Sequence, residues 1–373
     1  MDALMLPLNW QRVRLGDIGK PCMCKRVMKH QTTRYGEIPF YKIGTFGNTA
    51  DAFISKKLFL EYKTKYSFPK KGDILISASG TIGRAVIYDG KPAYFQDSNI
   101  VWIDNDETLV KNDFLFYAYS NVKWNTEHTT ILRLYNDNFR NTLIPLPPLN
   151  EQNAIANILS TLDRYLYALD ALILKKEGVK KALSFELLSQ RKRLKGFNQT
   201  WQRVRLGDIA NYLISNLSAE QITQQGKIKV YDVNNFIGYT DTTFISDKPY
   251  ISIVKDGSVG RVRILPPKTN ILSTMGALIA NHKTTTEFLF YLLSNFDFKN
   301  FTSGSIIPHI YFKDYKEKTI FLPSLNEQSA IANILSDLDN EIASLKNKKR
   351  QFENIKKALN HDLMSAKIRV LKK

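Results

Sequence analysis

Two short glycine-rich segments carry arginines whose setting suits contact with an anion or a nucleic-acid base. They read "SGTIGR", ending at Arg84, and "DGSVGR", ending at Arg261. Paired glycines permit a tight loop and a close approach of the backbone, and an arginine at its end can hold a phosphate or a guanine edge. Thr81 and Ser258 occupy the same position in the two loops and join the candidates. The alternative is a structural hairpin whose arginine pairs with a nearby carboxylate.

Further basic and polar residues extend this set of candidates for nucleic-acid contact. Lys and Arg supply sequence-independent attraction to phosphates, whereas amide side chains read base edges. In the first half of the chain they lie in the basic stretch 24–34 and in "FYKIGTFGN", and in the second half in "YDVNNF". The candidates are Lys25, Arg26, Arg34, Lys42, Asn234 and Asn235. For any one of them, a solvated basic surface is the competing interpretation.

Residue patterns that would support a reaction are missing from the sequence. The Pro-Pro pairs in "LPPL" and "LPPK" lack the Asn or Asp and the aromatic residue that an amino-methyltransferase needs around them. Neither G-x-G-x-x-G nor G-x-x-x-x-G-K-[ST] is present to cradle a nucleotide. "EYK" at 61–63, with Asp51 upstream, resembles half of a nuclease site, but the second half of the chain has nothing equivalent.

Metal binding is not indicated either. The five histidines show no ligand spacing, and Cys22 and Cys24 cannot complete a zinc site without two further ligands. We expect these two cysteines to be incidental reduced thiols. We therefore predict that the chain catalyses nothing by itself and holds no metal or cofactor.

Charge favours a nucleic-acid partner. The 373 residues include 53 Lys and Arg against 35 Asp and Glu, a net charge of +18. Such an excess attracts phosphate polymers, although a basic protein that never touches nucleic acid remains the alternative. No run of 18 apolar residues suggests a membrane span, and the first residues do not resemble a secretory signal. We expect a cytoplasmic protein.

The chain repeats itself. "LPPLNEQNAIANILSTLD" at 146–163 matches "LPSLNEQSAIANILSDLD" at 322–339 in 15 of 18 positions, at an offset of 176. "WQRVRLGDI" at 10–18 recurs unchanged at 201–209, at an offset of 191. The landmarks "FIS", G-x-x-G-R and "FLFY" keep their order between the two motifs. We infer a tandem duplication whose second variable segment is 15 residues shorter.

The nearly invariant segment predicts a long helix in each copy. Pro147 blocks helix upstream, and Asn150 and Asn326 are suitable N-caps. Each helix should run about 40 residues, or roughly 60 Å. Apolar residues recur at steps of three and four, as a helix-pair seam requires: Ile155, Leu159, Leu162, Leu166, Leu169, Ile173, and then Ile331, Leu335, Leu338, Ile342, Leu345 and Phe352. The two helices are each other's natural partner.

Four lysines interrupt this seam. Lys176, Lys180, Lys349 and Lys356 fall on the apolar stripe, so packing should weaken there or the lysines should extend outward to solvent.

The variable segments indicate a mixed α/β fold. "DILISASG", "AVIYDG", "YISIVKDG" and "RVRILPP" resemble strands ended by glycine or proline turns, and "NDFLFYAYSN" and "TEFLFYLLSN" resemble short amphipathic helices. The fold class predicted is α+β, with two globular modules separated by two long antiparallel coiled-coil helices and an internal pseudo-two-fold repeat. The predicted boundaries are 1–149 and 196–325 for the modules, and 150–195 and 326–373 for the helical regions.

Over essentially its whole length the chain resembles the specificity subunit of a type I DNA restriction–modification system. The tandem order, the Leu-Pro-x-Leu-x-Glu-Gln entry to each helix and the G-x-x-G-R loop in each module carry this resemblance. The short lead before Trp10 departs from the family pattern, and it leaves open how the N-terminus closes against the last helix.

The resemblance implies a non-catalytic subunit that binds double-stranded DNA through two target-recognition domains. It implies two docked modification subunits that carry S-adenosylmethionine and methylate adenine, with restriction subunits that use ATP and Mg in some systems. Because the two variable segments differ in sequence, the target should be bipartite and asymmetric. Two other hypotheses remain: an orphan DNA-binding scaffold without a methyltransferase partner, and a nuclease or methyltransferase in its own right.

Overall fold

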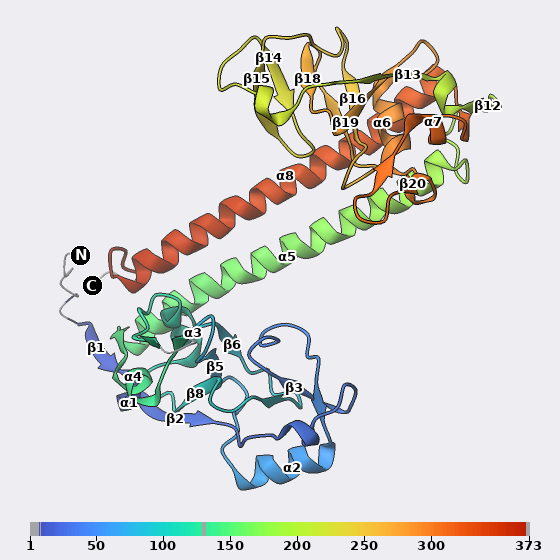
Figure 1. Cartoon of the computed structure of the whole chain (residues 1–373). Coiled ribbons are helices and arrows are strands. Elements are labelled where there is room, and N and C mark those ends of the chain that lie inside the picture. Colours follow the sequence, from blue (N-terminus) through green and yellow to red (C-terminus); the bar gives the residue numbers. More distant parts are fainter. Residues whose placement is uncertain (1–6, 8, 129–131, 371–373) are drawn as a thin grey trace. The chain divides into compact units, whose positions relative to one another are not determined.

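The computed structural model describes residues 7, 9–128 and 132–370. The chain divides into two compact units: unit 1 combines 1–169 with 348–373, and unit 2 comprises 170–347. Each unit contains one module and part of each long helix, α5 (Leu149–Leu188) and α8 (Leu325–Met364) (Figure 1).

Both long helices run for 40 residues, as predicted. The predicted N-caps are wrong by two residues, because Asn150 and Asn326 lie within the first turn. The first helical bonds join Gln152 N to Pro148 O and Gln328 N to Ser324 O, both at 2.9 Å. Since the cap residue accepts the first such bond, Pro148 and Ser324 are the caps.

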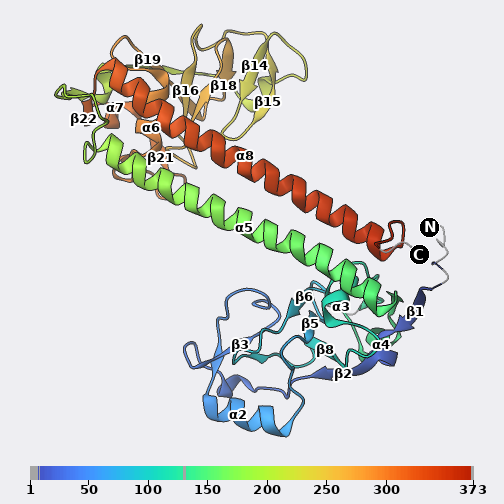
Figure 2. The same ribbon diagram turned by 180° about the vertical axis from the view of Figure 1, so that it is seen from behind.

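The module of unit 1 contains two small sheets. The first has the order β2-β8-β5-β6 and is antiparallel: β2 (Gly19–Met23), β8 (Ile100–Asn105), β5 (Ile74–Ser77) and β6 (Ala85–Ile87). The second has the order β4-β3-β7: β4 (Phe53–Ile54), β3 (Ile38–Tyr41) and β7 (Tyr94–Phe95). Helix α3 (Asn112–Tyr119) lies between the first sheet and the start of α5 (Figure 2).

Unit 2 repeats this arrangement. Its four-stranded sheet has the order β13 (Ala210–Ile214), β19 (Met275–Ala280), β16 (Tyr250–Val254) and β17 (Val262–Leu265). Its three-stranded sheet has the order β15 (Phe236–Thr240), β14 (Ile228–Tyr231) and β18 (Thr269–Ile271). Helix α6 (Thr286–Ser294) corresponds to α3.

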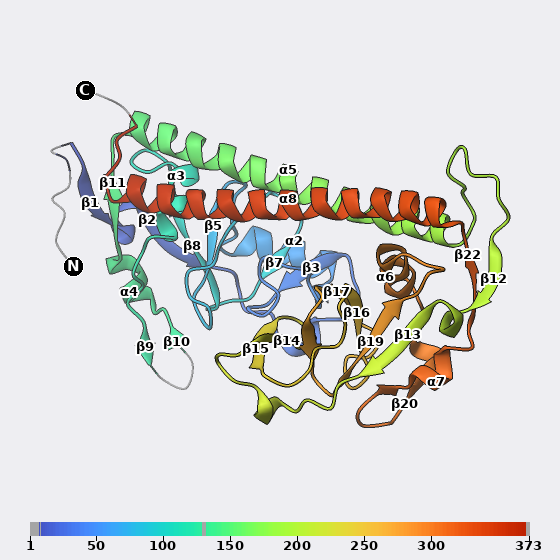
Figure 3. The ribbon, with the colours of Figure 1, turned by 90° about the horizontal axis from the view of Figure 1, so that it is seen from above.

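Short elements complete each module. Antiparallel strand pairs join the "WQRVR" segment to the residues that precede each long helix: β1 (Gln11–Arg14) with β11 (Leu143–Leu146), and β12 (Gln202–Arg205) with β22 (Thr319–Leu322). Small hairpins precede α4 (Asn136–Asn141) and α7 (Phe312–Tyr315): β9 (Glu127–His128) with β10 (Leu132–Arg133), and β20 (Thr302–Ser303) with β21 (His309–Ile310) (Figure 3). Only unit 1 has α2 (Lys56–Lys65) among the described residues, since in unit 2 the chain passes from Ser246 to β16 within four residues.

Module and helices share one core in each unit. In unit 1, Phe114 and Ile76 pack in one cluster with Ile155 and Leu159 of α5 and Leu363 of α8. Of the proposed seam, seven residues are buried: Ile155, Leu159, Leu169, Ile173, Ile331, Leu335 and Ile342. The other five are half-buried: Leu162, Leu166, Leu338, Leu345 and Phe352. A module therefore cannot leave its helices without exposing apolar surface.

Contacts between α5 and α8 run antiparallel within each unit. In unit 1 the rings of Tyr165 and Phe352 lie 4.7 Å apart between centroids, and Lys356 pairs with Asp163. In unit 2, Lys176 pairs with Glu341 at 2.8 Å and Lys180 with Asp339 at 2.5 Å. Three of the four seam lysines thus bind a carboxylate of the opposite helix.

Candidate nucleic-acid interface

The two glycine-rich loops have the backbone geometry that their sequence predicts. They join β5 to β6 and β16 to β17, and their glycines all have positive φ: 66° and 81° at Gly80 and Gly83, 83° and 79° at Gly257 and Gly260. A Cβ at Gly83 would lie 2.1 Å from Nε1 of Trp124, and one at Gly260 would lie 2.6 Å from the ring of Phe298. The close approach therefore serves packing of the loop against an aromatic side chain of its own module.

Each loop is bound to the small hairpin of its module. Gly80 N donates to Leu132 O at 3.3 Å, and Gly257 N donates to Pro308 O at 2.9 Å. Isolated β-bridges join Ser79 to Arg133 and Asp256 to His309. The loop is therefore bonded to the hairpin in each module, and Arg133 and His309 occupy equivalent positions in these bridges.

The arginines at the ends of the loops have different surroundings. Arg84 Nη1 donates to the carbonyl of Phe46 at 3.0 Å, so it supports a neighbouring loop through a backbone oxygen rather than the carboxylate considered above. Arg261 is exposed, and its side chain has no hydrogen bond or ion pair to the part of the chain that the structure describes. Thr81 and Ser258 are both exposed on their loops.

A hollow of about 460 Å³ in the first module gathers four cationic side chains. Arg26 and Lys42 were candidates from sequence, and the fold adds Lys29 and Arg133. The wall also includes Thr32, Gln96, Asp97, Ser98 and Asn99. Lys29 lies within the predicted basic stretch, but nothing local in the sequence links Arg133 to it.

Hydrogen bonds hold the polar wall of this hollow in place. Arg26 Nε donates to Asp97 Oδ2 at 2.7 Å, and Lys42 Nζ lies 2.8 Å from Asp51 Oδ1. Hydrogen bonding to Lys42 lowers the pKa of the Asp51 carboxyl, which stays ionised at neutral pH. Asn99 Oδ1 accepts from Ser79 Oγ at 2.7 Å, and this bond orients the amide.

The remaining candidates lie outside this hollow. Lys25 Nζ lies 5.0 Å from the centroid of the Tyr66 ring, and Arg34 is exposed. Asn234 and Asn235 form the β14–β15 turn, where their backbone N–H groups donate to Asp232 Oδ1 at 2.8 and 2.7 Å. Their side chains are exposed.

The second module has a hollow of a different character near the corresponding segments. Its volume is about 340 Å³, and its lining contains no charged residue: Leu213, Ile214, Ser215, Asn216, Leu217, Gln221, Thr242, Thr243, Phe244, Ile245 and Asn270.

Two residues of the repeated Leu-Asn-Glu-Gln motif anchor each module to the long helices, a role that sequence reasoning missed. Glu151 accepts from Trp10 Nε1 at 3.0 Å and from Arg369 Nε and Nη2 at 2.6 and 2.9 Å. In unit 2, Glu327 makes the same bonds with Trp201 and Arg193 at 3.0, 2.8 and 2.9 Å. The identity of both motifs between the copies was the available signal.

The Glu151 anchor joins the segment around Trp10 to the residues that follow the last helix. Trp10, near the start of the chain, and Arg369, which follows α8, meet on one carboxylate in unit 1. An arginine fork on a carboxylate gives a charge-assisted bidentate bond.

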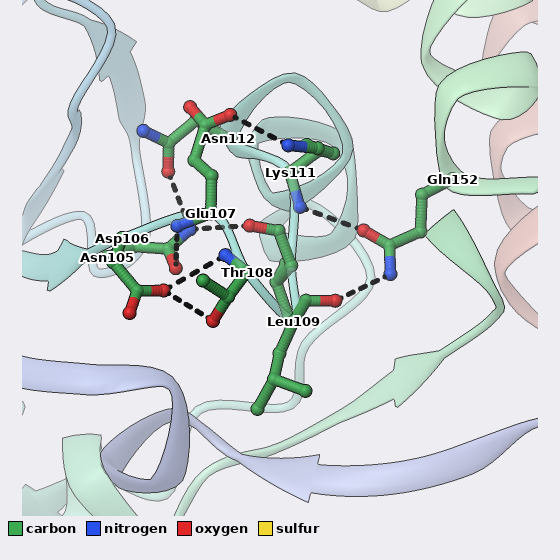
Figure 4. Close-up of polar contacts among 9 residues, drawn as sticks. Asn105, Asp106, Glu107, Thr108, Leu109, Lys111, Asn112 and Gln152 are labelled. Atoms are coloured by element: carbon green, nitrogen blue, oxygen red, sulfur yellow. Dashed lines mark hydrogen bonds and ion pairs between the residues drawn. The ribbon is translucent and has the colours of Figure 1, made fainter. Parts of the chain in front are cut away.

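The glutamine of the motif fixes the segment before α3. Gln152 Nε2 donates to Leu109 O at 2.9 Å, while Oε1 accepts from Lys111 N at 2.8 Å (Figure 4). Nε2 also donates to Pro147 O at 2.8 Å. Gln328 makes the matching bonds in unit 2 to Lys283 O, Pro323 O and Thr285 N. Every polar atom of this buried side chain is satisfied.

The two cysteines and the "EYK" segment have surroundings that do not activate them. Burial raises the pKa of Cys24 to about 12 and also raises that of Cys22. Glu61 of "EYK" is on α2 and pairs with Lys65 at 3.1 Å. The described residues contain no group of three or more His, Cys, Asp or Glu arranged to hold a metal ion.

A duplicated α+β module, each copy anchored to a pair of long helices, defines a class of two-module proteins. The chain matches the model of one family, described as the type I restriction modification DNA specificity domain, over residues 7–176 and again over 198–354. It belongs to this family.

Relatives carry the same description. The chain is 26% identical to the type I restriction enzyme MjaVIII specificity subunit of Methanocaldococcus jannaschii over 414 aligned positions, covering 99% of this chain and 95% of the relative. It is 64% identical to a putative type I restriction enzyme specificity subunit of Haemophilus influenzae over 148 residues, which are 39% of this chain and 38% of that protein.

Solved structures share the fold. The crystal structure of the S subunit of the Mycoplasma genitalium type I restriction–modification system matches with a TM-score of 0.64 at 21% identity, covering 96% of this chain and 98% of that one. A chain from a study of type I complex assembly matches with a TM-score of 0.56 at 16% identity, with the same coverage.

These matches confirm the predicted family and the predicted α+β fold with its internal repeat. Since the family is one of DNA-specificity domains, they also confirm a DNA-recognition subunit rather than an enzyme. No helix within the described residues is both long and apolar enough to cross a membrane.

Proposed function

We propose that this chain reads a bipartite, asymmetric duplex target for a type I restriction–modification enzyme and docks two modification subunits that methylate adenine. The observation that carries the proposal is a frame built twice with the same anchors, on which the two modules present different polar surfaces. Glu151 and Glu327 hold the frame identically, whereas one hollow has four cations and the other none.

Exposed residues that are identical in the two copies support docking of two equal partners. Leu149 and Leu325 begin the long helices with 40% and 47% of their surface exposed, and Asn157 and Asn333 face solvent about two turns later. Packing within the chain does not require solvent-facing positions to match, so a partner that meets both copies accounts for the identity. An exposed leucine at each site is typical of a contact surface.

We place the methyl donor, S-adenosylmethionine, on the modification subunits. ATP and Mg belong to restriction subunits in systems that contain them. This chain contributes recognition and spacing, and works in the cytoplasm with the DNA it reads.

The test is coexpression of this chain with a modification subunit of the same system, followed by purification and methylation-aware sequencing of the host DNA. We expect two modification subunits per chain and one bipartite asymmetric adenine motif. A chain that purifies alone and binds duplex without directing methylation would instead support the orphan scaffold. Cleavage or methylation by the purified chain alone, with Mg or S-adenosylmethionine, would support an enzyme.

A further inference from the structure

We propose that the hollow of the first module reads the edge of a guanine, with Arg26 as the reading side chain and Asp97 as the residue that positions it. The proposal rests on the proposed function, because it assumes that this module meets duplex DNA. It adds the place of contact, the base, and a difference between the two half-sites.

Equivalent hydrogen bonds align the segments that line the first hollow with their counterparts in the second module. Met28 N donates to Gln31 Oε1 at 2.8 Å, and Ser218 N donates to Gln221 Oε1 at 2.9 Å. The parallel pairs β3–β7 and β14–β18 then continue in the same register. At this constant offset of 190, the second module has Asn216, Ala219 and Asp232 where the first has Arg26, Lys29 and Lys42.

The fourth cation also differs between the modules. The equivalent bridges to the glycine loops place His309 where the first module has Arg133. His309 Nδ1 is bound to Asp256 Oδ1 at 2.7 Å. All four cationic positions of the first hollow therefore carry other residues in the second module, and of these four counterparts only Asn216 lines the hollow of that module.

Arg26 has the geometry of a reading arginine. Its Nε is held by Asp97 at 2.7 Å, and its two Nη groups have no partner among the described residues. The Arg26 side chain is 67% exposed and that of Asp97 only 14%, so the carboxylate is the fixed base of the pair. Two free N–H donors on a fixed plane match the O6 and N7 acceptors of guanine in the major groove.

The composition of the wall favours a base edge over a phosphate. Asp97 faces the same hollow and would repel a phosphate. Asn99, whose Oδ1 is bound by Ser79 Oγ, and Gln96, whose Oε1 accepts from Ile43 N at 3.0 Å, line this wall with their amino groups unbonded to the described chain. Fixed amide donors and a fixed arginine suit base recognition, while Lys29, Lys42 and Arg133 can balance flanking phosphates.

The glycine loop takes part through its support of the wall. Ser79 precedes Gly80, and its hydroxyl orients the Asn99 amide, while Gly80 N is bound to Leu132 next to Arg133. The G-x-x-G-R loop therefore joins the hairpin to the hollow.

The experiment uses the complete complex of this chain with its modification subunit, on host DNA read by methylation-aware sequencing. Arg26→Ala is expected to lower discrimination at one G·C pair of one half-site by about 10- to 100-fold, with the other half-site unchanged. Arg26→Lys should lose the same discrimination, because it keeps the charge but not the fork. Asn216→Ala is the matched control: it should leave the guanine position untouched and act, if anywhere, on the other half.

Four outcomes overturn the proposal. Retained discrimination in Arg26→Lys, or a uniform loss of binding with a smaller salt dependence in Arg26→Ala, would make Arg26 a phosphate contact. An unchanged motif in Arg26→Ala, beside a wild-type complex that methylates a bipartite motif, removes this inference and leaves the proposed function intact. A wild-type complex that yields no motif removes both.

Discussion

The two modules are attached to the long helices by the same contacts, but they present different surfaces. Over residues 10–149 the first carries 20 Lys and Arg against 13 Asp and Glu, a net charge of +7; over 201–325 the second carries 14 against 10, a net charge of +4. The anchors to the helices keep their residue types and bonding pattern, while the cations of the first hollow are replaced at every equivalent position. The two copies have therefore kept the residues that attach each module to the long helices, and they differ in the residues that line the hollow of the first module.

The difference in length has one main location. From Ser55 to Ile76 the chain advances 21 residues, and from Ser246 to Ile253 it advances 7, so 14 of the 15 missing residues are lost there. In the first module this segment forms α2, whose Phe59 packs edge-on against Phe68. The insertion extends the first module away from the repeated frame and leaves the strand order unchanged.

The largest expected effect comes from exchanging one half for the other. Arg193 follows α5 as Arg369 follows α8, at the constant offset of 176. In a fragment of residues 1–200, Arg193 of one copy can therefore take the place of Arg369 on Glu151 of another copy. Coexpressed with the modification subunit, this fragment should dimerise and methylate a palindrome built from the first half-site.

Arg193→Ala within the fragment supplies the control for this result. It removes the cation that would replace Arg369 and should prevent dimerisation, as measured by sedimentation. A monomeric, folded fragment that directs no methylation would refute interchangeable halves.

A proline in either long helix should separate recognition from folding. Leu162→Pro or Leu338→Pro removes a helical hydrogen bond at half-buried positions and costs roughly 3 kcal/mol or more. Each module keeps its own sheets, so binding to a half-site should survive while selectivity for the joined site is lost. Binding to targets with altered spacers measures this, and unchanged preference for one spacer would show that the helices do not set it.

Loss of the motif glutamate should destabilise both units to a similar degree. Glu151 and Glu327 have 2% and 1% of their side-chain surface exposed and each holds a tryptophan and an arginine. Replacing either by Ala leaves those donors unpaired, at about 2–4 kcal/mol. Thermal unfolding checks this; Glu→Gln, which keeps one acceptor, should lose less. If only the Glu151 variant lost stability, the anchor would be dispensable in unit 2. The short segment between Arg193 and Trp201 would then keep these two residues in place without Glu327.

Local patterns in the sequence sufficed for the long helices, the glycine loops and the strands around them. Apolar residues such as Ile155 and Leu159 recur every three to four positions, so the helix can be predicted from the sequence without tertiary information. Glu151 and Arg369 are 218 positions apart, and only packing brings them together. The hollow joins 26–32 to 96–99 and Arg133 through two sheets, an arrangement that depends on strand order and has no signature in any one segment.

The smallest expected effect separates the two loop arginines, which sequence treats as equals. Arg84→Ala removes the bond to Phe46 O and should lower stability by about 0.5–1.5 kcal/mol, whereas Arg261→Ala removes an exposed side chain without a described partner and should leave the melting temperature unchanged. Both should weaken duplex binding if they contact DNA, and binding of the whole chain should fall steeply with salt. Melting curves and binding at two ionic strengths distinguish the contributions. If Arg261→Ala neither binds more weakly nor changes the salt response, the loop of the second module has no DNA contact through its arginine. If Arg84→Ala loses stability alone, the first loop serves to support the residues around Phe46, and the modules differ in mechanism as well as in charge.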